Sequence, residues 1–344
     1  MKVLGLISSL EDPASRFRIL QYQDYLAKMG ANLYTKTFFP PKESDPPKAL
    51  NIFSKRLNKK TWRLIQYYSR KKYFAQQRSW DVIWQNRLLL YKNSTIEKQI
   101  KKPRVFDFDD AIWLTEGKEQ VDAAIATADL VFAGNEFLAD YAIKLNESTE
   151  IVPTTIDTNR FFNSNFLPQQ FNLGWIGTRS NFKYLELIKK PILEFLQSHE
   201  EARLIIVSSH PPENLPVDGK KILFKLWSAV KENELINEFS VGLMPLADDE
   251  WSKGKCSAKM LQYMACAKPV IVSPVGNNLK IVNEASIGLH AGAEEEWLAA
   301  FQKLKNEPEL AKELGNNGRS LVETNYSAEK WAIKIFDHFK QLIR

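Results

Sequence analysis

The chain has 344 residues, 44% of them hydrophobic and 26% charged, a composition that suits two globular domains with separate cores. No run of about 18 apolar residues occurs, which excludes a spanning helix, and the two cysteines, Cys256 and Cys266, exclude a disulfide framework and favour the cytoplasm. The net charge of +6 belongs to the first half: residues 1–160 carry 25 Lys and Arg against 19 Asp and Glu, and residues 161–344 carry 22 of each.

Short apolar segments alternate with longer amphipathic ones, which is typical of a parallel α/β sheet. We predict strands near 2–7, 32–38, 81–85, 104–107, 130–132, 150–152, 171–176, 203–208, 221–224, 240–244, 269–273 and 287–290. Helices are predicted near 16–29, 58–78, 93–101, 118–127, 135–145, 181–197, 229–236, 257–266, 278–284, 293–305, 307–324 and 328–343. The pattern therefore predicts an α/β fold of two Rossmann-like, doubly wound domains.

Polar, turn-forming residues mark the boundary between the two predicted domains. They lie near 157–165, just before the apolar strand at 171–176. We therefore expect domains at 1–160 and 161–327, with a last helix at 328–344. Two such domains facing one another would form a cleft, in which ligands bind beyond the carboxyl ends of the strands.

The first predicted helix opens with two basic residues, Arg16 and Arg18. One of them could face an anionic acceptor, and a surface salt bridge is the alternative. A larger basic excess follows, because residues 48–104 hold 16 Lys and Arg against only Asp81 and Glu97. This segment would attract phosphate-bearing acceptors, anionic lipid or nucleic acid.

The predicted helix at 58–78 carries part of that basic excess together with Trp62, Ile65 and Tyr73. A basic amphipathic helix with aromatic residues can lie on an anionic membrane surface. We therefore expect a peripheral membrane contact through residues 48–104. The alternative is a helix that packs on the first sheet and keeps a solvated basic face.

Carboxylates follow the fourth predicted strand. Asp107, Asp109 and Asp110 lie in the tract 105–113, and the carboxyl ends of strands line the ligand crevice in this architecture. They could bind acceptor hydroxyls, orient a cationic transition state or act as a base. Helix capping by Asp109 or Asp110 is the alternative, and Asp107 should lie inside the strand. Further on, we expect Asn135 to cap the next helix or to face the cleft.

The first strand of the second half ends in a glycine turn that leads into a helix. Gly177, Arg179 and Lys183 follow this strand, and a strand–glycine–helix junction offers backbone N–H groups to a phosphate. The alternative is an ordinary helix entry with surface cations.

The tract 253–276 indicates a loop, a helix, a turn and a strand. Ser257 is the predicted N-cap, and a helix N-terminus with Lys255 and Lys259 beside it suits a diphosphate. Gln262, one turn further, could bond a ribose hydroxyl. An amphipathic helix with solvated lysines is the alternative.

This tract resembles the donor-binding helix of the large retaining glycosyltransferase family usually numbered four. The closer resemblance is to a branch that shares Gly254-Lys255-Cys256, Lys259 and Tyr263-Met264-Ala265. The family's two glutamates of this region fall on Gly254 and Gln262, so both carboxylates are absent.

The resemblance extends to the tract around Asp110, which is similar to the Asp-Phe-Asp-Asp-Ala-Ile-Trp of the branch. It implies the GT-B architecture and transfer of a sugar from a nucleotide-diphosphate sugar to a glycan, lipid-linked or small acceptor, with retention and without metal or other cofactor. It implies donor contacts through Gly177, Arg179, Lys183, Lys255, Lys259 and Gln262, a catalytic Asp110, and acceptor contacts near Arg16, Arg18 and Asn135. All four histidines lie beyond residue 160, so the first domain offers no histidine base.

Two other functions stay open. A non-catalytic protein of the same fold that binds a nucleotide sugar or a polyanion would fit the absent glutamates, whereas an epimerase would be expected to show cleft histidines. Nucleic-acid binding is not expected, because no recognised module accompanies the basic segment.

Overall fold

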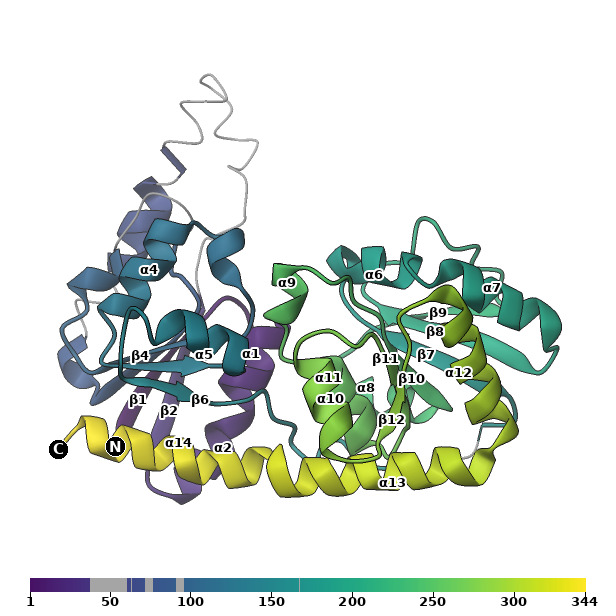
Figure 1. The fold of residues 1–344 in the computed structure, drawn as a ribbon. Helices are drawn as coiled ribbons and strands as arrows, with labels where there is room; N and C mark the ends of the chain where they lie inside the picture. The colour runs from purple at the N-terminus through teal and green to yellow at the C-terminus, as the bar shows by residue number, and fades with distance from the viewer. Residues whose placement is uncertain (38–60, 63, 72–76, 91–95, 167) are drawn as a thin grey trace. The chain divides into compact units, whose positions relative to one another are not determined.

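The computed structural model describes residues 1–37, 61–62, 64–71, 77–90, 96–166 and 168–344. Contacts divide the chain into two compact units, which Figure 1 draws as a ribbon. Unit 1 consists of Met1–Thr154 and Glu329–Arg344, and unit 2 consists of Thr155–Ala328. Most of the basic segment 48–104 that precedes residue 77 lies outside the described residues.

Unit 1 is built on one six-stranded parallel sheet with the order β2-β1-β3-β4-β5-β6. Its strands are Lys2–Ile7 (β1), Asn32–Thr37 (β2), Val82–Asn86 (β3), Arg104–Phe108 (β4), Leu130–Ala133 (β5) and Thr149–Ile151 (β6). The strand order reverses direction between β1 and β3. In open α/β sheets the ligand crevice lies at such a switch point, beyond the carboxyl ends of the strands.

The helices of unit 1 are Pro13–Arg18 (α1), Gln23–Lys28 (α2), Lys118–Ala126 (α4), Glu136–Ala142 (α5) and Ala328–Leu342 (α14), the last of which begins in unit 2. Short 3-10 turns occur at Leu20–Tyr22 (η1), Gln77–Ser79 (η3), Ile96–Gln99 (η4) and Ile112–Leu114 (η5). Residues 61–62 and 64–71 are helical as well.

The last helix, α14, joins unit 1 through aromatic packing. Phe339 contacts Trp84 on β3 and Phe132 on β5, at ring-centroid distances of 5.3 and 6.3 Å. His338 also packs on Phe132, at 5.6 Å. Unit 1 therefore contains a histidine, but a distant part of the chain supplies it and it lies among aromatic rings.

Unit 2 has a second six-stranded parallel sheet, with the order β12-β11-β10-β7-β8-β9. Its strands are Phe171–Ile176 (β7), Ala202–Ser208 (β8), Ile222–Leu226 (β9), Val241–Met244 (β10), Val270–Val272 (β11) and Gly288–His290 (β12). This is the Rossmann strand order, and its switch point lies between β7 and β10.

The helices of unit 2 are Phe182–Glu186 (α6), Lys189–Ser198 (α7), Glu232–Asn237 (α8), Glu250–Lys253 (α9), Ala258–Ala265 (α10), Asn277–Glu284 (α11), Glu294–Asn306 (α12) and Pro308–Asn325 (α13), with a 3-10 turn at Arg179–Asn181 (η6). α7 packs with α12, and α10 packs with α13 (Figure 1). Trp175, Phe195, Trp297 and Phe301 are fully buried members of its main core.

The twelve predicted strands are all present, each within two residues of its predicted ends. Two predicted helices are broken. The helix expected at 16–29 begins earlier, because Asp12 accepts a hydrogen bond from the Ser15 N–H at 3.0 Å and Pro13 occupies the first turn. The helix expected at 181–197 is interrupted at Leu187, the residue four before Pro191, whose ring clashes with the carbonyl at that position.

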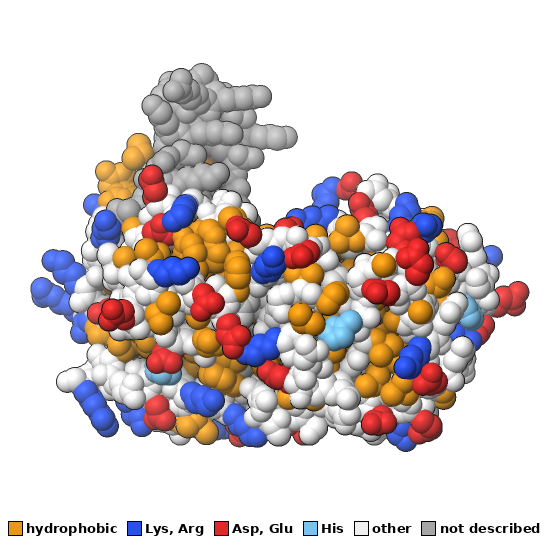
Figure 2. All heavy atoms as spheres, viewed as in Figure 1, with side chains coloured by type: hydrophobic (Ala, Val, Ile, Leu, Met, Phe, Trp, Pro, Cys, Tyr) orange, Lys and Arg blue, Asp and Glu red, His pale blue; other side chains and the backbone are white. Residues whose placement is uncertain are grey.

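Acidic and basic side chains alternate over the face of unit 2 that Figure 2 shows, in keeping with the balanced charge of residues 161–344. Across the described ranges, no helix has the length and apolar character needed to cross a bilayer.

Candidate active site

Two neighbouring aspartates beyond the carboxyl end of β4 share one guanidinium. Arg87, which follows β3, donates through Nη2 to Asp109 Oδ1 at 2.7 Å and to Asp110 Oδ2 at 2.5 Å, and through Nε to Asp109 at 3.0 Å. Burial lowers the pKa of Arg87, but the charges of Asp109 and Asp110 outweigh burial and raise the pKa well above its ordinary value. The structure thus holds two carboxylates that share one guanidinium at the ligand-binding edge of the sheet.

Neither aspartate caps a helix. The 3-10 turn η5 begins after Ala111, and no side chain caps it. Asp110 is 17% exposed and Asp109 is 16% exposed, so both carboxylates keep some access to solvent or ligand. A role of Asp110 in binding or activating a substrate hydroxyl stays a prediction.

Arg18, predicted on the acceptor side, lies instead in the interior of unit 1. Its Nε donates to Asp107 Oδ1 at 2.8 Å, its Nη1 donates to the Val152 carbonyl at 2.6 Å, and the two charged side chains are 1% and 0% exposed. Burial raises the pKa of Asp107 and Arg18 opposes that rise. The register of α1 against β4 turns this arginine inward, so Arg18 serves the fold.

We expect Arg18→Met to destabilise the protein by about 3–5 kcal/mol, because it leaves the Asp107 carboxylate buried without its cation. Urea denaturation of the variant measures this loss. The double variant Arg18→Met, Asp107→Asn should recover about half of it, since the uncompensated charge is gone. A loss below about 1 kcal/mol in the single variant would contradict the assignment.

Two further acceptor-side candidates, Arg16 and Asn135, are largely buried, and their contact with an acceptor stays a prediction. Asn135 caps α5, because its Oδ1 accepts the Leu138 N–H at 2.9 Å, and the residue is 5% exposed. Arg16 is 6% exposed and lies over the Phe17 ring at 5.1 Å. Capping, one of the two alternatives for Asn135, is what the structure has.

Three lysines of unit 2 lie against aromatic rings near the carboxyl end of β7. Lys259 Nζ is 4.8 Å from the Trp175 ring, and Lys255 Nζ is 5.3 Å from Trp251 and 5.7 Å from Tyr184. Lys183 Nζ is 4.9 Å from the same Tyr184 ring. Aromatic faces attract ammonium groups, so the rings fix where these cations lie.

Asp249, which caps α9, adds one acid to this lysine cluster. Burial raises the pKa of Asp249, but hydrogen bonds from Ser252 and the charges of Lys183 and Lys255 outweigh burial and lower it. Cations held in one place suit a diphosphate.

Gly177 follows β7 directly and lies beside this cluster. A Cβ at this position would lie 2.5 Å from the Trp175 ring and 3.0 Å from Cε of Lys259, so only glycine fits. Arg179 lies apart from these contacts, since its side chain is 62% exposed and pairs with Glu213. Exposed ion pairs bind weakly, so Arg179 can exchange Glu213 for another anion.

The start of α10 differs from its predicted form. Ser257 precedes the helix, but its side chain does not cap it and its backbone is left-handed, at φ 57°. The buried Oγ donates instead to Asn278 Oδ1 at 2.7 Å. A strained backbone conformation that the surrounding structure holds in place is common at ligand-binding sites.

Gln262, the predicted ribose contact on α10, is buried at 3% exposed. The helix is enclosed on several sides: Met264 contacts Gly318 of α13, and Tyr263 lies where any Cβ on Gly242 would collide at 2.2 Å. Gln262 Nε2 is buried and makes no hydrogen bond. A contact of Gln262 with the donor ribose stays a prediction.

Some of the other buried polar atoms without a hydrogen bond among the described residues lie at carboxyl ends of strands, whereas Asn172 Oδ1 lies near the start of β7. Those at carboxyl ends include both side-chain atoms of Asn86 at the end of β3 and Oγ of Ser208 at the end of β8. Buried polar groups normally bond to protein, water or ligand. At these edges of the two sheets, a polar ligand could form hydrogen bonds with the buried side-chain atoms of Asn86 and Ser208.

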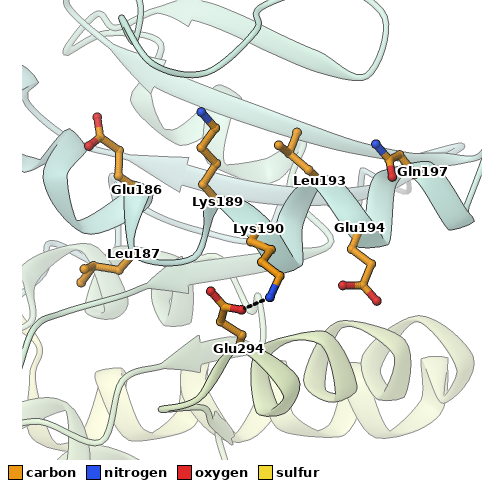
Figure 3. A pocket seen from close by; sticks show the side chains of 8 residues that line it. All are labelled: Glu186, Leu187, Lys189, Lys190, Leu193, Glu194, Gln197 and Glu294. Carbon is orange, nitrogen blue, oxygen red and sulfur yellow. Dashed lines mark hydrogen bonds and ion pairs between the residues drawn. The ribbon is translucent and has the colours of Figure 1, made fainter.

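Two other features take no part in the site. A shallow hollow of about 540 Å³ lies over α7, where Lys190 pairs with Glu294 at 2.6 Å (Figure 3). Both cysteines are buried, and burial raises the pKa of the Cys266 thiol to about 12, so Cys266 is no nucleophile. Within the described residues, no group of His, Cys, Asp and Glu could hold a metal ion.

Sequence reasoning missed Arg87 and Trp251. Arg87 follows a predicted strand at the switch point of unit 1, and that position was the available signal. Trp251 lies on α9, a four-residue helix too short to show a period in the sequence.

Residues 170–307 match the model of the family "Glycosyl transferases group 1", so this part of unit 2 is a glycosyltransferase domain. No curated protein matches the chain at a significant level.

Solved structures resemble the chain over nearly its whole length. Sucrose-phosphate synthase from Thermosynechococcus elongatus has a TM-score of 0.71 at 16% identity, over 99% of both chains. HepE from Anabaena in complex with UDP-glucose has a TM-score of 0.72 at 14% identity, over 99% of this chain and 100% of that one. WaaG, a glycosyltransferase involved in lipopolysaccharide biosynthesis, has a TM-score of 0.68 at 14% identity, over 98% and 99%. The fold is therefore GT-B, as expected.

Proposed function

We propose that this protein transfers a sugar from a nucleotide-diphosphate sugar to a glycan, lipid-linked or small acceptor, with retention of configuration and without a metal ion. The observation that carries the proposal is the coincidence of the lysine cluster (Lys183, Lys255 and Lys259) with the glycosyltransferase domain at 170–307. UDP-sugars are the first donors to test, because HepE, a structural neighbour, is described in complex with UDP-glucose.

The donor diphosphate would lie against the start of α10, between Gly177 and the lysine cluster. The first turn of a helix carries backbone N–H groups without intrahelical partners and a partial positive charge. Lys255 and Lys259 add full charges beside it. Together they stabilise the negative charge that grows on the leaving diphosphate as the sugar departs.

The acceptor would bind at the carboxyl edge of the unit 1 sheet, with one hydroxyl on Asp110. A carboxylate there can accept a hydrogen bond from the acceptor hydroxyl and hold the hydroxyl oxygen toward the sugar. In a retaining transfer the donor's own phosphate can take that proton. Arg87 offsets one of the two carboxylate charges of this acid pair.

The test is a screen of UDP, GDP, ADP and TDP sugars, first by thermal shift and then by turnover with a broad acceptor panel. Product NMR reads the anomeric configuration, and EDTA should leave the rate unchanged. A nucleotide sugar that binds without turnover across all acceptors would favour the non-catalytic binding protein. Absence of any nucleotide binding would overturn both functions.

We also propose peripheral contact with an anionic membrane through residues 48–104, of which 61–62 and 64–71 are described as helical. Leu64, Ile65 and Tyr68 are 56%, 39% and 63% exposed, and Lys71 lies over the Tyr67 and Tyr68 rings. Exposed apolar and aromatic groups beside cations suit a lipid interface.

We expect the wild type to cosediment with vesicles containing phosphatidylserine at low salt. Leu64→Ser, Tyr68→Ser should abolish this binding, because it removes the inserting groups. Tyr25→Ser, on α2, is the control. Equal binding to neutral vesicles, or no effect of the double substitution, would contradict the contact.

A further inference from the structure

We infer that Arg87 is a positioning residue of the active site. Its guanidinium orients the Asp110 carboxylate toward the acceptor hydroxyl. The inference rests on the proposed function, since it concerns the same Asp110. It adds a residue to which neither the sequence pattern nor any relative described above gives a role.

Arg87 has a backbone conformation that arginine rarely adopts. Its φ is 57°, in the left-handed region, where a side chain is strained. Such strain persists only where the surroundings fix it, and it concentrates at functional sites.

Three hydrogen bonds around Arg87 fix this conformation. The Arg87 N–H donates to the Asp107 carbonyl at 2.8 Å, and the Arg87 carbonyl accepts from Gln85 Nε2 at 2.8 Å. Two residues on, the Leu89 N–H donates to the Glu97 carboxylate at 2.9 Å. Gln85 and Glu97 are themselves buried, at 0% and 3% exposed. The loop after β3 is therefore held by an internal network, which directs the guanidinium.

The guanidinium then fixes the acids. Nε and Nη2 both donate to one oxygen of Asp109, Oδ1, and the same Nη2 also donates to Oδ2 of Asp110. A planar two-pronged donor sets direction as well as charge, which a lysine cannot do. The loop after β3 that carries Arg87 also lies at the switch point between β1 and β3, where ligands bind in sheets of this kind.

Arg87→Met should lower kcat by about 100-fold, the cost of a small misplacement of a reacting group, while the donor KM stays unchanged. The acid limb of the pH–rate profile should move up by about one pH unit, since two adjacent carboxylates without their cation repel one another. Arg87→Lys restores charge but not direction, so it should restore the acid limb and recover only part of kcat.

Arg78→Met is the matched control, because Arg78 is an exposed arginine of the same unit. Hydrogen exchange of the peptide 108–114 gives a readout without activity and should quicken in Arg87→Met only. If Arg87→Met changes neither the acid limb of the profile nor the hydrogen exchange, the inference is overturned. A raised acceptor KM at normal kcat would also overturn it, because it would mean that Arg87 binds the acceptor directly. Failure of the wild type to turn over any donor instead overturns the proposed function.

Discussion

Replacement of Asp110 by Asn is expected to lower kcat by about 100- to 1,000-fold, the range of a lost proton-accepting contact in the transition state. Asn has the shape of Asp and can still bond Arg87, so the fold should be unchanged. It lacks the negative charge that polarises an acceptor hydroxyl and stabilises a cationic sugar. The donor KM should change little, because Asp110 lies in unit 1 and the lysine cluster lies in unit 2.

Initial rates at saturating donor and acceptor measure this effect, and thermal unfolding checks the fold. Asp140→Asn is the control, since Asp140 is an exposed aspartate on α5 of the same unit. Activity of Asp110→Asn within about threefold of the wild type would remove Asp110 from the site. A rise in acceptor KM alone would make it a binding residue that does not act on the transition state.

The second large effect is expected from the lysine cluster. Lys259→Met should weaken donor binding by about 10- to 100-fold, because a hydrogen bond to a charged group contributes about 1.5–3 kcal/mol. Lys255→Met should have an effect of similar size, and the double variant should leave no measurable donor affinity. Methionine keeps the apolar stem that lies on Trp175 or on Trp251 and Tyr184, so only the charge is removed.

Titration calorimetry with the donor found in the screen gives these affinities. Wild-type affinity should fall as salt rises, and the variants should show a smaller salt dependence. Lys190→Met is the control, because Lys190 forms an exposed ion pair with Glu294 on the outer side of α7 (Figure 3). If both single variants bind the donor as the wild type does, the diphosphate lies elsewhere.

Several features of this fold could be predicted from sequence. Parallel strands covered on both faces appear in the sequence as short continuous apolar runs, so all twelve strands could be predicted. Capping is also local: Asn135 bonds the N–H three residues on, as its position before α5 predicts. The resemblance to a glycosyltransferase donor helix likewise rests on one contiguous tract, residues 253–276.

Other features depended on which distant segments meet. Arg18 and Arg16 are equivalent in the sequence, but Arg18 meets Asp107, 89 residues away, and becomes part of the core. Arg87 meets Asp109 and Asp110 because β3 and β4 are neighbours, with Asn86 opposite Asp107. Gln262 is buried because α13 and β10 cover α10.

The sequence by itself determined the positions of the strands and the domain class of this protein, because an apolar run is a property of a few consecutive residues. Only the tertiary structure decided which charges are buried, which are paired and which remain for a ligand. The reason is physical: the energy of a charge depends on the dielectric and the counter-charge around it, and residues far apart in the chain supply both.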